Sequence, residues 1–142
     1  MNSACSAGLR FQLAQETFSI WRLPPEQPVD WEKLAESSWY SVTCTTDEIS
    51  VVAPEGTGLG GDKCETGWRG LKIEGPLAFG LIGIVAGVSG VLAEAKISIF
   101  AVSTYDTDYF FVKAVDVERA ITALEAAGHS VNRLPPMPTQ RP

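Results

Sequence analysis

Residues 97–113 read Ile-Ser-Ile-Phe-Ala-Val-Ser-Thr-Tyr-Asp-Thr-Asp-Tyr-Phe-Phe-Val-Lys, two apolar runs around a polar centre. β-Branched and aromatic residues fill 97–102 and 108–113, as they do in β-strands. Between the runs, 103–107 consists of residues that are common in turns. The stretch therefore predicts two strands joined by a polar turn.

The segment before these strands predicts another strand and a helix. Residues 68–74 alternate apolar with polar or small side chains, the pattern of a strand with one buried face, and Gly75-Pro76 ends it. Apolar residues between 79 and 95 recur every three or four positions, so one side of a helix can pack on a sheet. Its glycines lower helix propensity and are tolerated where the backbone approaches a ligand, a sheet or a partner closely.

The segment after the two strands predicts a second helix and a last strand. Asp116 stands where a helix N-cap is expected, and Gly128 stands where the helix C-terminus favours a left-handed residue. Residues 129–134 can return as a strand before Pro135-Pro136. The order strand, helix, strand, strand, helix, strand is that of the ferredoxin-like βαββαβ fold, an α+β architecture.

The N-terminal half predicts a weaker copy of the same unit, with its second helix missing. Strands are expected at 11–14 and 18–23, a short helix capped by Asp30 at 31–36, and a hairpin from 39–44 and 48–52. The Gly-rich segment 54–66 is predicted to be a loop.

The uncharged stretch 75–93 raises the alternative of a membrane span. Its Gly-Pro start leaves a helical part of roughly 16 residues, against the roughly 20 that a span needs. No cluster of Lys or Arg flanks it. We therefore expect a buried amphipathic helix and no membrane association.

Composition narrows the class of protein. The 142 residues are 45% apolar and 20% charged, which is typical of a globular chain. Eleven basic against seventeen acidic residues give a net charge of −6, which argues against nucleic-acid binding. Three widely spaced cysteines and one histidine favour reduced thiols and no metal site. Residues 1–10 lack the pattern of a secretory signal, so we expect a cytoplasmic protein.

The residues offer little for catalysis. The Gly-rich segment 56–61 lacks the Gly-Lys-Ser/Thr of a phosphate-binding loop and precedes a strand rather than a helix. His129 is the only imidazole, and it follows a predicted helix end. Asp106 and Asp108 could do acid–base work, but two acids alone specify no substrate. We expect no enzymatic activity and no cofactor.

The polar segment 103–108 has two interpretations that the residues alone leave open. Ser, Thr and Asp are common turn formers, so the segment can be a solvated hairpin turn. Hydroxyl and amide groups also suit a carboxylate, and an Asp can hold an ammonium or guanidinium group, so the segment can be a recognition loop.

Residues 97–109, preceded by 71–79, resemble the aspartokinase-related ACT domains, and within that family the tandem ACT proteins and CASTOR-like arginine sensors. The resemblance extends over 67–131 and is weaker but collinear over 18–52. It implies two ferredoxin-like ACT modules packed side by side, an abbreviated one at 1–66 and a complete one at 67–142.

The resemblance also implies a ligand site at a joint between modules, where ACT proteins bind amino acids. The implied site residues are Gly75, Pro76, Phe79, Gly80, Leu81, Ser103, Thr104, Tyr105, Asp106 and Asp108. A glycine turn before a helix N-terminus exposes amide donors to a carboxylate, and a nearby Asp can hold the amine. In the first module, 44–48 reads Cys-Thr-Thr-Asp-Glu in place of the fuller Ser-Thr-Tyr run, so an intact second site is not expected there.

These observations predict a non-catalytic sensor that binds a free amino acid and acts through another protein or by sequestration. An alternative is an interaction module that has lost its ligand and docks on a partner through Trp31, Trp39 and Tyr40. Open sheet edges and a second apolar sheet face further predict a two-fold homodimer.

Overall fold

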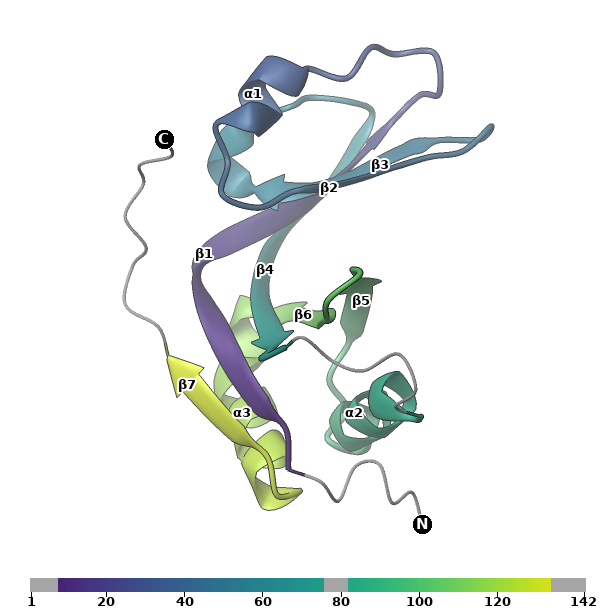
Figure 1. Cartoon of the computed structure of the whole chain (residues 1–142). Coiled ribbons are helices and arrows are strands. Elements are labelled where there is room, and N and C mark those ends of the chain that lie inside the picture. Colours follow the sequence, from purple (N-terminus) through teal and green to yellow (C-terminus); the bar gives the residue numbers. More distant parts are fainter. Residues whose placement is uncertain (1–7, 76–81, 134–142) are drawn as a thin grey trace. The chain divides into compact units, whose positions relative to one another are not determined.

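The computed structural model describes residues 8–75 and 82–133 and has a mixed α/β fold with a mostly antiparallel sheet (Figure 1). Its described residues form two compact units. The N-terminal unit comprises 16–68, and the C-terminal unit comprises 8–15 together with 69–75 and 82–133. Strands β1 (Arg10–Leu23) and β4 (Lys63–Ile73) each run from one unit into the other.

The N-terminal unit contains one short helix and a hairpin. Its elements are α1 (Trp31–Ala35), β2 (Ser41–Cys44), β3 (Ile49–Pro54) and the 3₁₀ turn η2 (Glu55–Thr57). Strand β3 pairs antiparallel with both β1 and β2. Helix α1 begins as predicted, because the Asp30 carboxylate accepts a hydrogen bond of 3.2 Å from the Lys33 amide.

One apolar cluster holds the N-terminal unit together. Alternating residues of β1 and β3 lie on one sheet face and pack with a leucine of α1, and the cluster consists of Trp21, Leu23, Leu34, Ile49, Val51 and Ala53. On the other face, the ring of Phe18 meets that of Trp39 edge-on, with centroids 5.7 Å apart. Trp39 is therefore half-buried rather than exposed, which corrects its predicted availability for docking.

The C-terminal unit places two helices against its strands (Figure 1). Its further elements are α2 (Ile84–Glu94), β5 (Ile99–Ser103), β6 (Asp108–Lys113), the 3₁₀ turn η3 (Ala114–Asp116), α3 (Val117–Ala126) and β7 (Ser130–Arg133). Neighbouring strands follow the order β7, β1, β4, β6, β5.

The helices bury residues spaced by three and four positions, as expected for amphipathic helices packed on a sheet. Helix α2 contributes Ile84, Val88 and Leu92, and α3 contributes Val117, Ala120, Ile121 and Leu124. They meet Leu71 and Ile73 of β4 and Phe110 and Val112 of β6. Because side chains alternate along a strand, Phe111 lies on the opposite sheet face, where its ring stacks on Phe100 at 4.7 Å.

Two departures from the predicted elements concern the long strands. Residues 11–14 and 18–23 form the single strand β1 rather than two strands. Strand β4 begins at Lys63, inside the predicted loop, and its first four residues are exposed. Exposure on both faces leaves no alternation of apolar and polar residues, and such alternation is what reveals a strand in a sequence.

A third departure is the position of the last strand. Strand β7 pairs in parallel with β1, where Phe11 lies opposite Val131, so the first residues of β1 complete the C-terminal sheet (Figure 1).

The predicted division at residues 66 and 67, and the side-by-side packing of two modules, stay predictions. Within 8–75 and 82–133, no helix combines the length and apolarity needed to cross a membrane.

Asp116 does not cap α3 with its side chain, which corrects the expected role. The residue ends the 3₁₀ turn η3, and its carboxylate accepts a hydrogen bond of 2.6 Å from Arg119 instead. Gly128 follows the helix with a φ of +97°, the left-handed conformation that was predicted.

Candidate functional site

The β5–β6 hairpin brings a hydroxyl and a carboxylate together at its end. Ser103 lies opposite Asp108 in the register, and the Ser103 hydroxyl donates a 2.6 Å hydrogen bond to the Asp108 carboxylate. Successive side chains of a strand point to opposite faces of the sheet, so Asp108 lies on the same face as Phe110 and Val112, two and four positions further along β6. Since those two residues pack against α2 and α3, the Asp108 carboxylate belongs to the helix-covered face.

The turn of this hairpin is closed by a threonine. The Thr104 amide donates to the Thr107 carbonyl at 2.8 Å. The Thr104 hydroxyl also donates to that carbonyl at 3.1 Å and accepts from the Thr107 amide at 3.2 Å. These local bonds give the polar segment a defined conformation.

Thr107 connects the hairpin to the end of β4. Its hydroxyl donates a 2.7 Å hydrogen bond to the Ile73 carbonyl, and the residue is only 4% exposed. This contact brings Ser103 and Asp108 to the strand end that precedes Gly75. Thr107 lies within the polar segment 103–108 that the sequence indicated, but it was not named among the site residues, because its contact is with a backbone carbonyl that the sequence does not show.

The first turn of α2 offers amide donors. Gly83 precedes the helix with a φ of +81°, no side chain caps the first turn within the described residues, and that turn contains no acidic residue. The first helical bond runs from the Gly87 amide to the Gly83 carbonyl at 2.8 Å. The amides of Ile84, Val85 and Ala86 lie at the positive end of the helix dipole, and no side chain of the described residues caps them.

The predicted site residues fall into three groups. Gly75, Ser103, Thr104 and Asp108 lie at or beside the end of β4, as the Thr107 contact shows. Tyr105, which is 81% exposed, and the exposed Asp106 form the outer part of the turn. The other predicted members, Pro76, Phe79, Gly80 and Leu81, lie outside the described residues.

The β2–β3 hairpin of the N-terminal unit has the same turn but lacks the hydroxyl and carboxylate pair. The Thr45 hydroxyl accepts from the Glu48 amide at 3.1 Å and donates to the Glu48 carbonyl at 3.3 Å. Cys44 lies opposite Ile49 in the register, at the positions that correspond to Ser103 and Asp108. A thiol and a buried aliphatic side chain thus replace the hydroxyl and the carboxylate.

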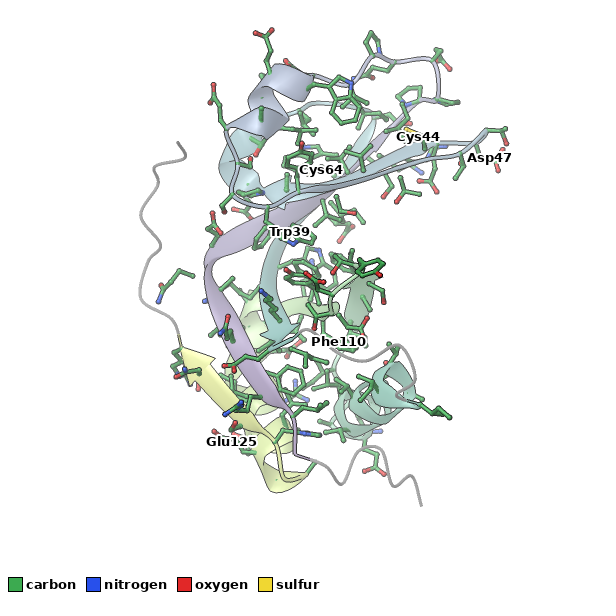
Figure 2. The ribbon with its side chains drawn as sticks, viewed as in Figure 1. Trp39, Cys44, Asp47, Cys64, Phe110 and Glu125 are labelled. Atoms are coloured by element: carbon green, nitrogen blue, oxygen red, sulfur yellow. The ribbon has the colours of Figure 1, made fainter. Side chains whose placement is uncertain are left out.

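Arg22 holds the N-terminal hairpin in place. Its guanidinium donates to the Asp47 carbonyl at 3.0 Å and to the Asp62 carboxylate at 2.9 Å. Asp47 lies near the tip of the hairpin in Figure 2, and Cys44 lies closer to the sheet. Cys44 and Cys64 are exposed free thiols, and the described residues contain no group of three side chains able to hold a metal ion.

His129 is buried between α3 and the start of β1. Its Nδ1 accepts a 2.9 Å hydrogen bond from the Leu9 amide, and its ring meets Phe11 edge-on at 5.7 Å. Burial lowers the pKa of His129 because it disfavours the charged imidazolium. An imidazole that accepts at Nδ1 and packs on a phenyl ring is a structural residue, and no nucleophile is placed beside it by these contacts.

Comparison with protein families gives a match to the ACT domain over residues 63–126. The match covers less than half of the 142-residue chain. The matched segment runs from the start of β4 to the end of α3, so the β5–β6 hairpin and the first turn of α2 both lie within the ACT domain. ACT domains are often regulatory and bind amino acids. No curated protein matches the chain.

Solved structures share the fold of this chain. The chain is similar to protein Atu0741 from Agobacterium tumefaciens, with 30% identity and a TM-score of 0.80 over 90% of this chain and 95% of that one. The regulatory subunit of aspartate kinase from Thermus thermophilus shares the fold at 14% identity, with a TM-score of 0.63 over 82% and 95% of the two chains. Clostridium acetobutylicum aspartate kinase gives 13% identity and 0.63, over 83% of this chain and 34% of the kinase.

These comparisons show an ACT-domain match over 63–126 and a fold shared with the solved structures. The finer resemblance to tandem ACT proteins and to CASTOR-like sensors stays a prediction. Thr45 and Thr104 make corresponding hydrogen bonds in the turns of the two hairpins.

Proposed function

We propose that this ACT protein is a non-catalytic sensor that binds a free amino acid in its C-terminal unit. The observation that carries the proposal is the placement of the Asp108 carboxylate, which lies on the helix-covered sheet face and is linked through Thr107 to the end of β4. The next helix along the chain is α2, and its first turn has no side-chain cap within the described residues. One carboxylate and one set of amide donors are complementary to the two charged groups of an amino acid.

Each end of the ligand has a matching group. The ammonium of the amino acid pairs with Asp108, whose position is fixed by the 2.6 Å bond from Ser103. The carboxylate accepts from the amides that begin α2, where the helix dipole favours negative charge. The segment 75–81 connects the two groups along the chain, and the ligand side chain would be selected there and by Tyr105.

A thermal-shift screen of the proteinogenic amino acids, each at about 10 mM, tests the proposal because a ligand that binds only the folded state raises Tm. We expect at least one amino acid to raise Tm. Its carboxamide and its analogue without the amino group should each give a smaller shift, because each lacks one of the two charges. Equal shifts from the amino acid and both analogues would show that neither charge is recognised.

The proposal includes a homodimer. Strand β5 stands at one end of the strand order, so one side of its backbone is open to pairing among the described strands. A second copy can cover such an edge. Light scattering during size exclusion should give twice the chain mass of 15.3 kDa, and a mass of one chain with and without amino acid would exclude the dimer.

A protein partner would receive the signal in the cytoplasm, where reduced thiols such as Cys44 and Cys64 are stable. The alternative function, an interaction module without a ligand, is favoured by the exposure of Trp31 and Tyr40. The two functions differ in their response to Asp108→Ala, which removes ligand binding in a sensor and leaves partner binding intact in a module that has lost its ligand.

A further inference from the structure

We infer that Thr107 is the positioning residue of the amino-acid site, because its hydroxyl fixes the recognition hairpin to the end of β4. The inference rests on the proposed function and adds a residue that need not touch the ligand. Thr107 would set the position of Asp108 on the hairpin relative to the end of β4.

The contacts of Thr107 separate two tasks. Its amide and carbonyl bond with Thr104 and close the turn. Its hydroxyl is directed away from the turn, to the Ile73 carbonyl at 2.7 Å, across 34 residues of sequence. The side chain is 4% exposed, so this bond is shielded from water, and loss of the hydroxyl would leave a buried carbonyl without that donor.

The N-terminal hairpin shows that the turn itself does not need this threonine. Thr45 makes the corresponding bonds there, and Glu48 occupies the place of Thr107. The Glu48 carboxylate lies 3.9 Å from the Arg22 guanidinium, so it serves a different contact. A hydroxyl at position 107 is therefore not required to close the turn, and the tether to β4 is what it adds in the C-terminal unit.

The tether joins the two sides of the ligand site. Ile73 lies two positions before Gly75, and Asp108 follows Thr107 directly. Binding of the ammonium at Asp108 and the carboxylate at α2 requires both sides at one fixed separation. A hairpin that is free to move from β4 must be ordered again when the ligand binds, and affinity falls accordingly.

The test compares Thr107→Val, which removes the hydroxyl at constant shape, with Thr107→Ser, which keeps it. The control is Thr122→Val, the same change at an exposed position of α3. Hydrogen exchange of the full chain without ligand reports the tether, and calorimetry reports affinity for the amino acid that gives the largest thermal shift with the wild-type chain.

We expect Thr107→Val to speed exchange of the amides of β6, which neighbours β4, by about fivefold or more, the fold-change for loss of one hydrogen bond. Its affinity should fall by about tenfold, whereas Thr107→Ser and Thr122→Val should stay within about threefold of wild type. Measurements at a temperature where every variant is folded separate this effect from global unfolding.

Two results would overturn the inference. Unchanged exchange in Thr107→Val would show that the hydroxyl does not hold the hairpin. Equal losses of affinity in the Val and Ser variants would show that the methyl packing, rather than the hydroxyl, matters. If no amino acid binds the wild-type chain, the proposed function fails, and the exchange data still decide whether Thr107 is a tether.

Discussion

Replacement of Asp108 by Asn should separate ligand binding from stability. Asn keeps the size of the side chain and an oxygen that accepts from the Ser103 hydroxyl, which now lies 2.6 Å from the carboxylate. It removes the negative charge that we assign to the ligand ammonium. The change therefore acts on recognition and leaves the hairpin pairing of β5 with β6 in place.

The expected loss of binding free energy exceeds the expected loss of stability. A hydrogen bond to a charged group contributes about 1.5 to 3 kcal/mol, so amino-acid affinity should fall about 10- to 150-fold. The Ser103–Asp108 bond is exposed and is retained in weaker, uncharged form, so stability should change by less than about 1 kcal/mol. For a chain of this size, that change lowers Tm by no more than about 4 °C.

Calorimetry and thermal unfolding of the same preparations measure both quantities. Glu125→Gln provides the matched control, because it removes one exposed carboxylate from α3 without touching the hairpin. The control should bind as wild type does. Wild-type affinity in Asp108→Asn, or an equal loss in Glu125→Gln, would refute the assignment of the ammonium to Asp108.

Three further changes test the fold. Gly70→Ala should lower the free energy of unfolding by about 1 to 3 kcal/mol, because the new Cβ would lie 3.1 Å from the Phe111 ring. An unchanged free energy of unfolding in chemical denaturation would contradict this packing. Gly90 lies in α2, and no atom lies within 4 Å of the Cβ that alanine would add. Gly90→Ala should therefore raise the free energy of unfolding by up to about 1 kcal/mol in the same assay. Burial lowers the pKa of His129 below 6.5, the ordinary pKa of a histidine side chain. As pH falls through 6.5, the unfolded chain therefore takes up the proton before the folded chain does, and the free energy of unfolding should decrease. His129→Asn, which can still accept from the Leu9 amide, should reduce this loss; identical pH profiles of denaturation midpoints would exclude a role for the imidazole.

Strands and helix ends were predictable from the sequence where an apolar run has clear limits or where one residue is suited to a helix cap. Strand β6 has the predicted bounds, 108–113, because its apolar run ends in charged residues on both sides. The Asp30 cap and the left-handed Gly128 followed from single residues whose chemistry suits those positions.

Long-range pairing was not predictable in the same way. The parallel pairing of Phe11 with Val131 joins segments that are 120 residues apart, and no local pattern encodes a partner strand. The exposed start of β4 at Lys63 carries no apolar alternation. The family resemblance indicated the polar run 103–108 as a site, but the role of Thr107 depends on one contact with a backbone carbonyl, which the sequence does not show.

Titration calorimetry of the wild-type chain with the amino acid selected by the thermal-shift screen tests most directly whether this protein is an amino-acid sensor. We predict saturable binding of one molecule per chain, because only the β5–β6 hairpin carries the Ser103–Asp108 pair and Ile49 replaces the carboxylate in the other hairpin. Two molecules per chain would contradict the single site. No saturable heat with any proteinogenic amino acid up to about 10 mM would contradict the proposed function itself.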